Sequence, residues 1–274
     1  MDESIAEEIR VYYEDDYDES QRIVKGLHEI ELVRTREIIE RHLPAGRLRI
    51  LDIGGGTGVH AKWLAGLGHS VELVDPMPRH VAAARALGAA GLPITASTGD
   101  ARRLTQPDDA FDAALMLGPL YHLTERSDRL QAWREALRVA KPGGVVIAAA
   151  ISRFASLFDG LVLDIFDDPD FRLIVERDLE TGQHRNPGRV DNWFTTSYFH
   201  LPDELRGEAE EAGANIVGLF GVEGLAAWLR HLADRWDDPE ARDLILASIR
   251  RTESEPTLSS LSQHMLLVAR RPDG

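Results

Sequence analysis

The sequence predicts an α/β fold in which a parallel β-sheet is covered by helices on both faces. Three observations support this prediction: short apolar runs alternate with helix-like segments, the runs are apolar almost without interruption, and residues 51–60 (LDIGGGTGVH) pass from such a run through glycines into a helix. Strands that are apolar on both sides need cover on both faces, as in parallel sheets. With 274 residues, 43% of them hydrophobic, the chain suffices for one large domain or one domain with an elaborate insertion.

The first part of the chain supplies most of the expected sheet. Residues 1–43 are predicted to be helical because apolar side chains recur near helical spacing, and residues 44–46 (PAG) end that segment. We expect strands over 48–53, 71–75, 92–96, 111–117 and 145–151, and helices over 59–67, 78–87 and 124–140. Thr124 is the expected N-cap of the last of these helices, and residues 141–144 (KPGG) form the expected turn before the fifth strand.

The alternation stops after residue 151. Residues 152–200 contain no clear strand and end in the aromatic-rich sequence NWFTTSYFH, so we expect an insertion that forms a lid at the carboxyl edge of the sheet. Beyond it we expect a helix over 202–212, a strand over 215–220, helices over 225–236 and 240–250, and a final strand over 264–269. The predicted domains are an N-terminal helical cap (1–46), a ligand-binding core (47–151), a lid or substrate insertion (152–200) and the C-terminal part of the core (201–274).

Charge and composition exclude several classes of partner. The net charge is −15, which disfavours binding to nucleic acid or to an anionic membrane surface. There is no cysteine, which excludes disulfides, thiolate metal sites and cysteine nucleophiles. The acidic N-terminus (MDESIAEEIR) resembles neither a signal nor a transit peptide, and the longest apolar run, residues 145–151, is far shorter than the ~20 residues of a membrane span. We therefore expect a cytoplasmic protein that is a monomer or a homodimer.

The glycine-rich stretch raises the question of its ligand. The sequence GTGVHA matches the dinucleotide signature G-x-G-x-x-A, and Asp75 at the end of the next expected strand could hold a ribose. However, Asp52 stands beside the loop, and no arginine or lysine occurs between it and Val59, so a pyrophosphate would face a carboxylate with no cation to offset it. S-adenosylmethionine carries an ammonium and a sulfonium and suits Asp52 better. Asp75 could then accept the ribose hydroxyls, and Asp100 could reach the adenine amine.

Four motifs, taken together, resemble those of a known family. LDIGGGTGVHAKWLAGLGHSVELVDPMP, TGDARRL, FDAALMLGPLYHL and LRVAKPGGVVIAAAI occur in the order typical of class I S-adenosylmethionine-dependent methyltransferases of small-molecule type. The resemblance covers residues 49–151 well and the last elements more loosely. It implies a Rossmann-like, doubly wound sheet of seven mostly parallel strands, the last one antiparallel.

The resemblance also implies which residues bind the cofactor. They are Asp52, Gly54, Gly55, Gly56, Gly58, Asp75, Pro76, Met77, Asp100, Ala101, Leu117 and Gly118. In addition, VYYEDDYDESQR resembles the first helices of small-molecule methyltransferases that close over the cofactor. Tyr13 and Tyr17 would then touch its methionine end and Arg22 its carboxylate; the alternative is a solvated acidic helix whose tyrosines pack on the sheet.

Methyl transfer from a sulfonium is an in-line displacement, which depends chiefly on alignment. A base is needed only when the acceptor arrives protonated. His122, just past the fourth expected strand, is the first candidate, although it could instead bond a backbone carbonyl. His200 and Tyr198 are the second. Aromatic residues of the lid could wall the acceptor or simply hold the lid on the sheet: Trp193, Phe194, Tyr198 and Phe199.

The acidic clusters YEDDYDES and DIFDDPD could bind Mg²⁺, but charge runs are usually solvated surface, and we expect no metal requirement. The acidic surface and the bulky lid favour a small-molecule acceptor, such as a secondary metabolite. The sequence LGPL stands where an NPPY-type tetrapeptide would favour transfer to nucleic-acid bases or protein glutamine. Two alternatives are a non-catalytic or cyclase-type protein that binds S-adenosylmethionine, and an NAD-dependent dehydrogenase.

Overall fold

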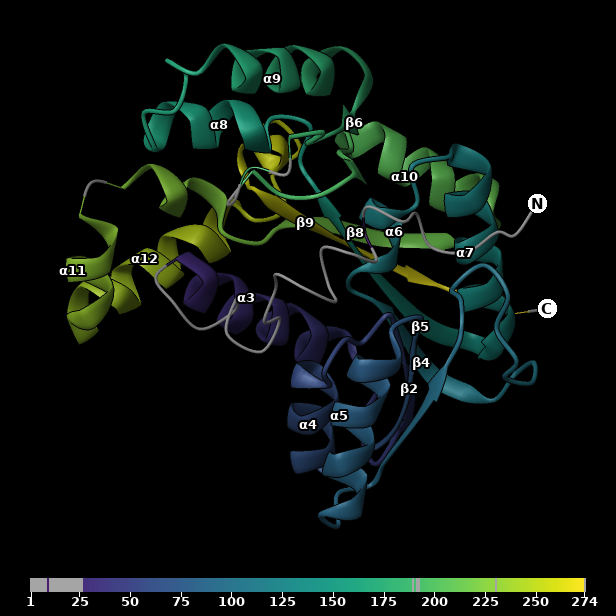
Figure 1. Cartoon of the computed structure of the whole chain (residues 1–274). Coiled ribbons are helices and arrows are strands. Elements are labelled where there is room, and N and C mark those ends of the chain that lie inside the picture. The colour runs from purple at the N-terminus through teal and green to yellow at the C-terminus, as the bar shows by residue number, and fades with distance from the viewer. Residues whose placement is uncertain (1–8, 10–26, 189, 191–192, 230, 274) are drawn as a thin grey trace.

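A single seven-stranded sheet organises the computed structural model, which describes residue 9 and residues 27–273 except 189, 191–192 and 230. The strand order is β3-β2-β1-β4-β5-β9-β8 (Figure 1). The strands are β1 (Arg49–Ile53), β2 (Ser70–Asp75), β3 (Ile94–Thr98), β4 (Phe111–Met116), β5 (Ala140–Ile151), β8 (Asn215–Gly221) and β9 (His264–Arg270). The pairs from β3 to β5 are parallel, whereas β9 runs antiparallel to both β5 and β8. The predicted mostly parallel sheet with an antiparallel last strand is confirmed.

Helices cover both faces of the sheet, as the apolar strands require. The helices on one face are α3 (Leu27–His42), α4 (Val59–Gly66) and α5 (Pro78–Ala89), and those on the other are α7 (Arg126–Val139) and α10 (Pro202–Glu211). Side chains alternate along β1, so Ile50 packs in the core beneath α3 and α4, whereas Leu51 packs with Trp133 of α7. Asp52 follows Ile50 by two positions and therefore points to the face that α3 covers.

The insertion after β5 contains more structure than expected. It forms α8 (Ala155–Val162), α9 (Pro169–Thr181) and a two-stranded sheet of β6 (Gln183–His184) and β7 (Ser197–Tyr198). The expectation of no strand is wrong for β6 and β7, because two-residue strands leave no periodicity to detect. Buried polar contacts stabilise this part: Asp178 accepts hydrogen bonds from Ser156 at 2.5 Å and from His184 Nδ1 at 2.8 Å.

Four further features differ from the predictions. The helix expected over 124–140 begins at Arg126 with Glu125 as N-cap, and the Thr124 carbonyl accepts a hydrogen bond from Arg129. A short helix that was not predicted, α6 (Pro119–His122), precedes it, and residues 141–144 belong to β5. The helix expected over 225–236 is divided into η2 (Gly224–Trp228) and α11 (Leu232–Asp237), because His231 has a positive φ of 55°.

The remaining elements close the C-terminal part of the chain. They are α12 (Pro239–Thr252) and the short helix η3 (Ser259–Leu261), which lead into β9. Among the described helices, none combines the length and the apolar character that crossing a membrane requires.

Candidate cofactor and acceptor site

A cavity of about 290 Å³ opens at the carboxyl edge of the sheet. It is lined by the loops that follow β1, β2, β3 and β4, by α3 and by the first residues of β9. Ligands of open α/β sheets bind at this edge. The lining includes all the predicted cofactor residues that the structure describes except Gly58: Asp52, Gly54, Gly55, Gly56, Asp75, Pro76, Met77, Asp100, Ala101, Leu117 and Gly118. Tyr13, Tyr17 and Arg22 lie outside the described residues.

The glycines of the loop after β1 are required by close contacts. A Cβ atom on Gly54, which has a φ of +67°, would lie 2.6 Å from the ring of Pro119, and one on Gly55 would lie 2.6 Å from Asp52 Oδ2. Gly58 has a φ of +91° and caps the N-terminus of α4, so its part in the loop is conformational. The bare backbone therefore lets the loop fold tightly over the Asp52 carboxylate.

Asp52 is a buried carboxylate at the end of β1, with 1% of its surface exposed. Neither of its oxygens has a hydrogen-bond partner among the described residues. Burial, followed by the charge of Asp75, raises the pKa of Asp52 to about 7. An unpartnered buried carboxylate is costly, so this end of the cavity suits a positively charged ligand.

Asp75, at the end of β2, joins two loops of the site. Its Oδ2 accepts a hydrogen bond from the Gly56 amide at 2.9 Å, and its Oδ1 accepts one from the Met77 amide at 2.8 Å. His80 Nδ1 lies 3.0 Å from the same Oδ1. These contacts fix the carboxylate, while Oδ2 keeps a second lone pair that could accept a hydroxyl. His80, which also lines the cavity, was not predicted.

Asp100, after β3, is held as an anion by Arg102. The guanidinium contacts Asp100 Oδ2 at 2.6 Å and Asp128 Oδ2 at 2.7 Å. Burial alone would raise the pKa of Asp100, but the hydrogen bonds from Arg102 hold it below its usual value. Arg102 and Asp128 also line the cavity and were not predicted. This end of the cavity therefore offers a hydrogen-bond acceptor of fixed charge.

The three predicted catalytic residues occupy different environments. His122, at the end of α6, lines the cavity; its ring packs edge-on to Tyr121 at 4.7 Å and stacks on Phe194 at 5.9 Å. His200 and Tyr198 do not line it. His200 is 0% exposed, its Nε2 lies 3.3 Å from Glu208 Oε2, and burial lowers its pKa.

The aromatic residues of the insertion pack mainly on one another and on the sheet. Tyr198 stacks under the Arg129 guanidinium at 3.6 Å and donates a hydrogen bond to Glu204 at 3.2 Å. Phe199 stacks on His184 at 4.7 Å, and Trp193 packs on Phe171 at 5.2 Å. The four aromatic residues predicted as possible walls of the acceptor are all absent from the described lining of the cavity: Trp193, Phe194, Tyr198 and Phe199. These contacts favour the alternative in which the aromatic residues hold the lid on the sheet over the one in which they wall the acceptor.

The structure describes one of the two acidic clusters that were considered for a metal, DIFDDPD. YEDDYDES lies outside the described residues. In DIFDDPD, Asp168 caps α9 and accepts a hydrogen bond from the Asp170 amide at 2.8 Å. The role of Asp168 as an N-cap accounts for the position of this carboxylate without a bound metal ion.

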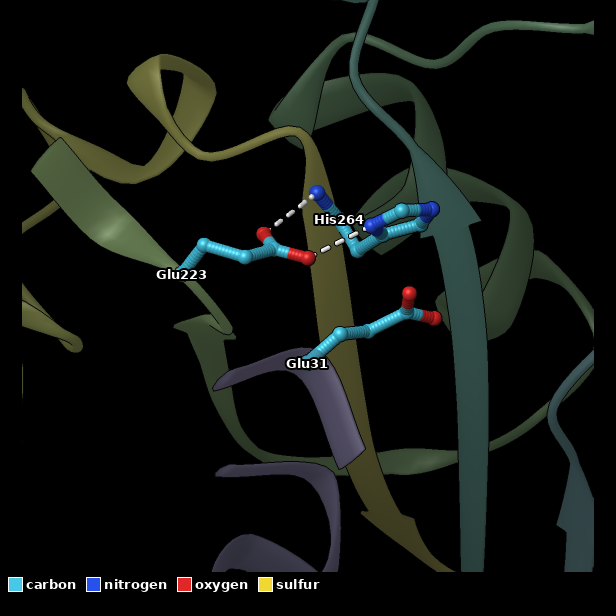
Figure 2. Close-up of side chains that lie close together, drawn as sticks. All are labelled: Glu31, Glu223 and His264. Carbon is cyan, nitrogen blue, oxygen red and sulfur yellow. Dashed lines mark hydrogen bonds and ion pairs between the residues drawn. The ribbon is translucent and has the colours of Figure 1, made fainter. Parts of the chain in front are cut away.

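Sequence reasoning missed a cluster of Glu31, Glu223 and His264 beside the cavity (Figure 2). Glu31 comes from α3, Glu223 follows β8 and His264 begins β9. One potential ligand atom of each lies within 4.8 Å of the others, and Glu31 and His264 line the cavity. The signal that could have found His264 is strand direction: an antiparallel strand presents its first residue at the edge where the parallel strands end.

Glu223 is 1% exposed and fully engaged in hydrogen bonds. Its Oε1 accepts from His264 Nδ1 at 2.6 Å, and its Oε2 accepts from the His264 amide at 2.9 Å and from Ser262 Oγ at 2.7 Å. The carboxylate therefore fixes both the backbone and the ring of His264. The cavity is thus lined by Asp52, an acid unpartnered among the described residues, and by a histidine, His264, that a buried acid holds in place.

Comparisons with known proteins agree with this geometry. A family model described as a methyltransferase domain matches residues 50–144. The ubiquinone biosynthesis O-methyltransferase of Cereibacter sphaeroides strain KD131 is 31% identical over 216 residues, which cover 77% of this chain and 76% of that protein. The protein of the same name from Methylobacterium nodulans is 26% identical over 210 residues, covering 73% and 76%.

Solved structures share the fold. The [4+2]-cyclase SpnF has a TM-score of 0.56 and 25% identity, covering 89% of this chain and 82% of that one. An S-adenosylmethionine-dependent methyltransferase from Methanosarcina mazei has a TM-score of 0.58 and 18% identity, covering 86% and 98%, a likeness of fold alone. Together with the match to the methyltransferase domain and the relative in Cereibacter sphaeroides, the order of motifs around the cavity shows that the chain belongs to the class I S-adenosylmethionine-dependent methyltransferases of small-molecule type, with S-adenosylmethionine as its cofactor.

Proposed function

We propose that this protein transfers a methyl group to a small molecule, such as a secondary metabolite, bound in the cavity beside the cofactor. Bound S-adenosylmethionine supplies an electrophilic methyl group on a sulfonium. The observation that carries the proposal is Asp52, a buried carboxylate without a partner among the described residues at the wall of this cavity. A ligand with an ammonium and a sulfonium would supply the positive charge that this carboxylate lacks.

The loops around Asp52 would hold the rest of the cofactor. Gly54, Gly55 and Gly56 would bring the backbone close to the methionine end, which Leu117 and Gly118 would also border. Asp75 is positioned to accept the ribose hydroxyls. The residues bordering the adenine would be Pro76, Met77, Asp100 and Ala101. On this proposal, residues 47–151 are the cofactor-binding core and residues 152–200 the insertion beside the acceptor.

The acceptor would occupy the end of the cavity beneath α3. Glu31, Thr35 and His264 supply polar groups there, and Val222 and Leu266 supply apolar ones. This mixture suits a small acceptor with an apolar body and a polar reacting group. His122 also lines the cavity and remains a candidate for contact with the acceptor.

Calorimetric titration tests the cofactor assignment. We expect S-adenosylmethionine and S-adenosylhomocysteine to bind and to raise the melting temperature, since a ligand at 100 times its Kd stabilises the folded state by about 2.7 kcal/mol. NAD serves as the control ligand and should give no heat. Binding of NAD without binding of S-adenosylmethionine would contradict the proposal.

A cyclase-type function is the second candidate, because the similar structure SpnF is a [4+2]-cyclase. Release of S-adenosylhomocysteine in the presence of a panel of acceptors separates the two functions. A methyltransferase releases one S-adenosylhomocysteine for each methylated product, whereas a protein that only keeps the cofactor releases none.

A further inference from the structure

The pair Glu223 and His264 has the geometry of a general base held by a carboxylate. A histidine whose Nδ1–H donates to a buried carboxylate is fixed in one tautomer, which leaves Nε2 basic. Here Nδ1 lies 2.6 Å from Glu223 Oε1, and His264 lines the cavity with 18% of its side chain exposed. Because the two ring nitrogens lie on different edges of the imidazole, Nε2 lies on the edge turned away from Glu223 (Figure 2).

The carboxylate itself is held from two sides. Ser262 Oγ and the His264 amide both donate hydrogen bonds to Glu223 Oε2. The Glu223 amide in turn donates to Ser262 Oγ at 3.0 Å, which fixes the serine hydroxyl beside the carboxylate. A carboxylate that accepts from three donors keeps its orientation. It would stabilise the imidazolium that forms when the ring takes a proton.

The two-residue period of β9 places the His264 side chain on the face of the strand that borders the cavity. Along β9, Leu266 and Val268 pack in the core beneath α3, and His264 lies on the same face by the two-residue period of a strand. Leu266 lines the cavity as well. His264 therefore faces the same compartment as Asp52, which is where an acceptor must lie to meet the methyl group.

Other titratable groups surround the pair. Glu31 and His28 come from α3, with His28 Nδ1 and Glu31 Oε2 3.5 Å apart. Asp159 of α8 accepts a hydrogen bond from Gln263 at 2.5 Å; burial raises its pKa to about 6, against the smaller opposing effect of His264 and His28. The ring thus stands among carboxylates, which favour its protonated form after it has accepted a proton.

The same cluster could be considered as a metal site, because Glu31, Glu223 and His264 are ligand types. The distances favour a proton-transfer pair instead. The 2.6 Å between Nδ1 and Oε1 is a hydrogen-bond length, and it is shorter than the ~3 Å that separates neighbouring ligands about 2.1 Å from one ion. Both oxygens of Glu223 also already accept hydrogen bonds.

We propose that His264 is the general base of the reaction, that Glu223 positions it, and that the acceptor is therefore a small molecule that reacts through a hydroxyl group. This inference rests on the proposed function. The hydroxyl proton passes to Nε2 of His264, and the acceptor oxygen forms a bond to the methyl carbon. The carbon–sulfur bond breaks, its electron pair remains on sulfur to give S-adenosylhomocysteine, and the proton then leaves His264 for solvent.

The kinetic test compares two acceptors with the variant His264→Asn. Asparagine keeps an amide N–H near the position of Nδ1, so Glu223 retains a donor, but it has no Nε2. The acceptor probes are catechol, which is protonated at pH 8, and 4-nitrophenol, which is largely ionised there. We expect kcat to fall about 100-fold for catechol and less than threefold for 4-nitrophenol, since an ionised acceptor needs no base.

Controls separate positioning, folding and cofactor binding. Glu223→Gln should lower kcat for catechol about tenfold and move the acid limb of its pH profile to lower pH, because the imidazolium loses a carboxylate. His28→Gln, beside the cluster but outside the described lining of the cavity, should leave both rates unchanged. Calorimetry should give all three variants the affinity of the unaltered protein for S-adenosylmethionine; if the unaltered protein itself binds none, the proposed function fails and not this inference alone.

Spectroscopy tests the pair without any acceptor. In the complex with S-adenosylhomocysteine, ¹⁵N spectra should show His264 protonated on Nδ1 and deprotonated on Nε2 at pH 8, with the signals assigned by their loss in His264→Asn. This result supports the inference even if neither probe is methylated. A proton on Nε2 overturns it. So do equal losses of kcat on both probes, methylation of amines alone, or activity lost in excess chelator and restored by Mg²⁺.

Discussion

Two buried carboxylates serve the site, but their surroundings are opposite: Asp52 lines the cavity, whereas Glu223 contacts the lining residue His264. Asp52 has no hydrogen-bond partner among the described residues, whereas Glu223 accepts from Ser262 and twice from His264. The first carboxylate needs a ligand to supply positive charge, and the second is complete within the protein. The difference indicates that one carboxylate is organised to bind a cation and the other to hold a side chain in place.

The largest expected effect comes from Asp52→Asn, which removes the charge and nearly keeps the shape. We expect the affinity for S-adenosylmethionine to fall about 100-fold, within the 2–5 kcal/mol typical of removing one partner of a buried charge pair. Calorimetry measures the affinity. Asp112→Asn is the matched control, because Asp112 is paired with Lys141 at the amino end of β4 and lies outside the described lining of the cavity. An unchanged affinity in Asp52→Asn would contradict a charge-based site.

Replacing each of the two carboxylates by its amide should change the free energy of unfolding in opposite directions. Glu223→Gln leaves donors imperfectly paired and should lower the free energy of unfolding by about 1–3 kcal/mol. Asp52→Asn removes an unpartnered charge and should raise the stability of the ligand-free protein at pH 8. Urea denaturation of both variants measures this. Destabilisation by both would show that Asp52 has a partner in the free protein.

The smallest expected effect is a proton linked to cofactor binding. Because the pKa of Asp52 is raised to about 7, most Asp52 side chains are protonated at pH 6. A bound cation favours the ionised form, so binding at pH 6 should release a proton and the affinity should rise roughly fivefold between pH 6 and pH 7. Calorimetry in two buffers of different ionisation enthalpy measures the proton, and Asp52→Asn should abolish its release.

The raised pKa also determines how stability changes with pH. The folded-state pKa of Asp52 lies above the unfolded value, so its stabilising contribution is complete below the unfolded pKa and is lost as pH rises through about 7. The ligand-free protein should therefore lose stability over this range relative to Asp52→Asn. S-adenosylmethionine should reduce that loss. Parallel pH dependence in the two proteins would show that Asp52 does not titrate in this range.

The cofactor end could be predicted from sequence because each of its parts directly follows a strand. Asp52, Asp75 and Asp100 stand at or just after the ends of β1, β2 and β3, and parallel strands bring these ends to one edge. The acceptor end could not, since Glu31, Glu223 and His264 come from distant segments. No local pattern shows which face of β9 His264 occupies, and only the antiparallel direction of β9 indicates that this strand begins at the cavity.

The insertion shows a similar limit of residue type. His200 and Tyr198 are predicted as catalytic candidates because histidine and tyrosine stand in an aromatic sequence after a long gap in the strand pattern. In the structure these side chains are engaged with Glu208, Glu204 and Arg129. Residue type alone does not distinguish a histidine that meets a ligand from one that completes a buried ion pair.

The close spacing of Glu223 and His264 has a consequence for how this part of the chain can change. The two residues are 41 positions apart, yet the Val222 amide donates to the His264 carbonyl at 3.0 Å, so they close the base of a long excursion that contains η2, α11 and α12. The pairing of β8 with β9 fixes the positions of these two residues, whatever the conformation of the segment between them. Loops of other length or shape could be exchanged between its ends, and substrate range could thereby diverge while the reactive pair stays in register.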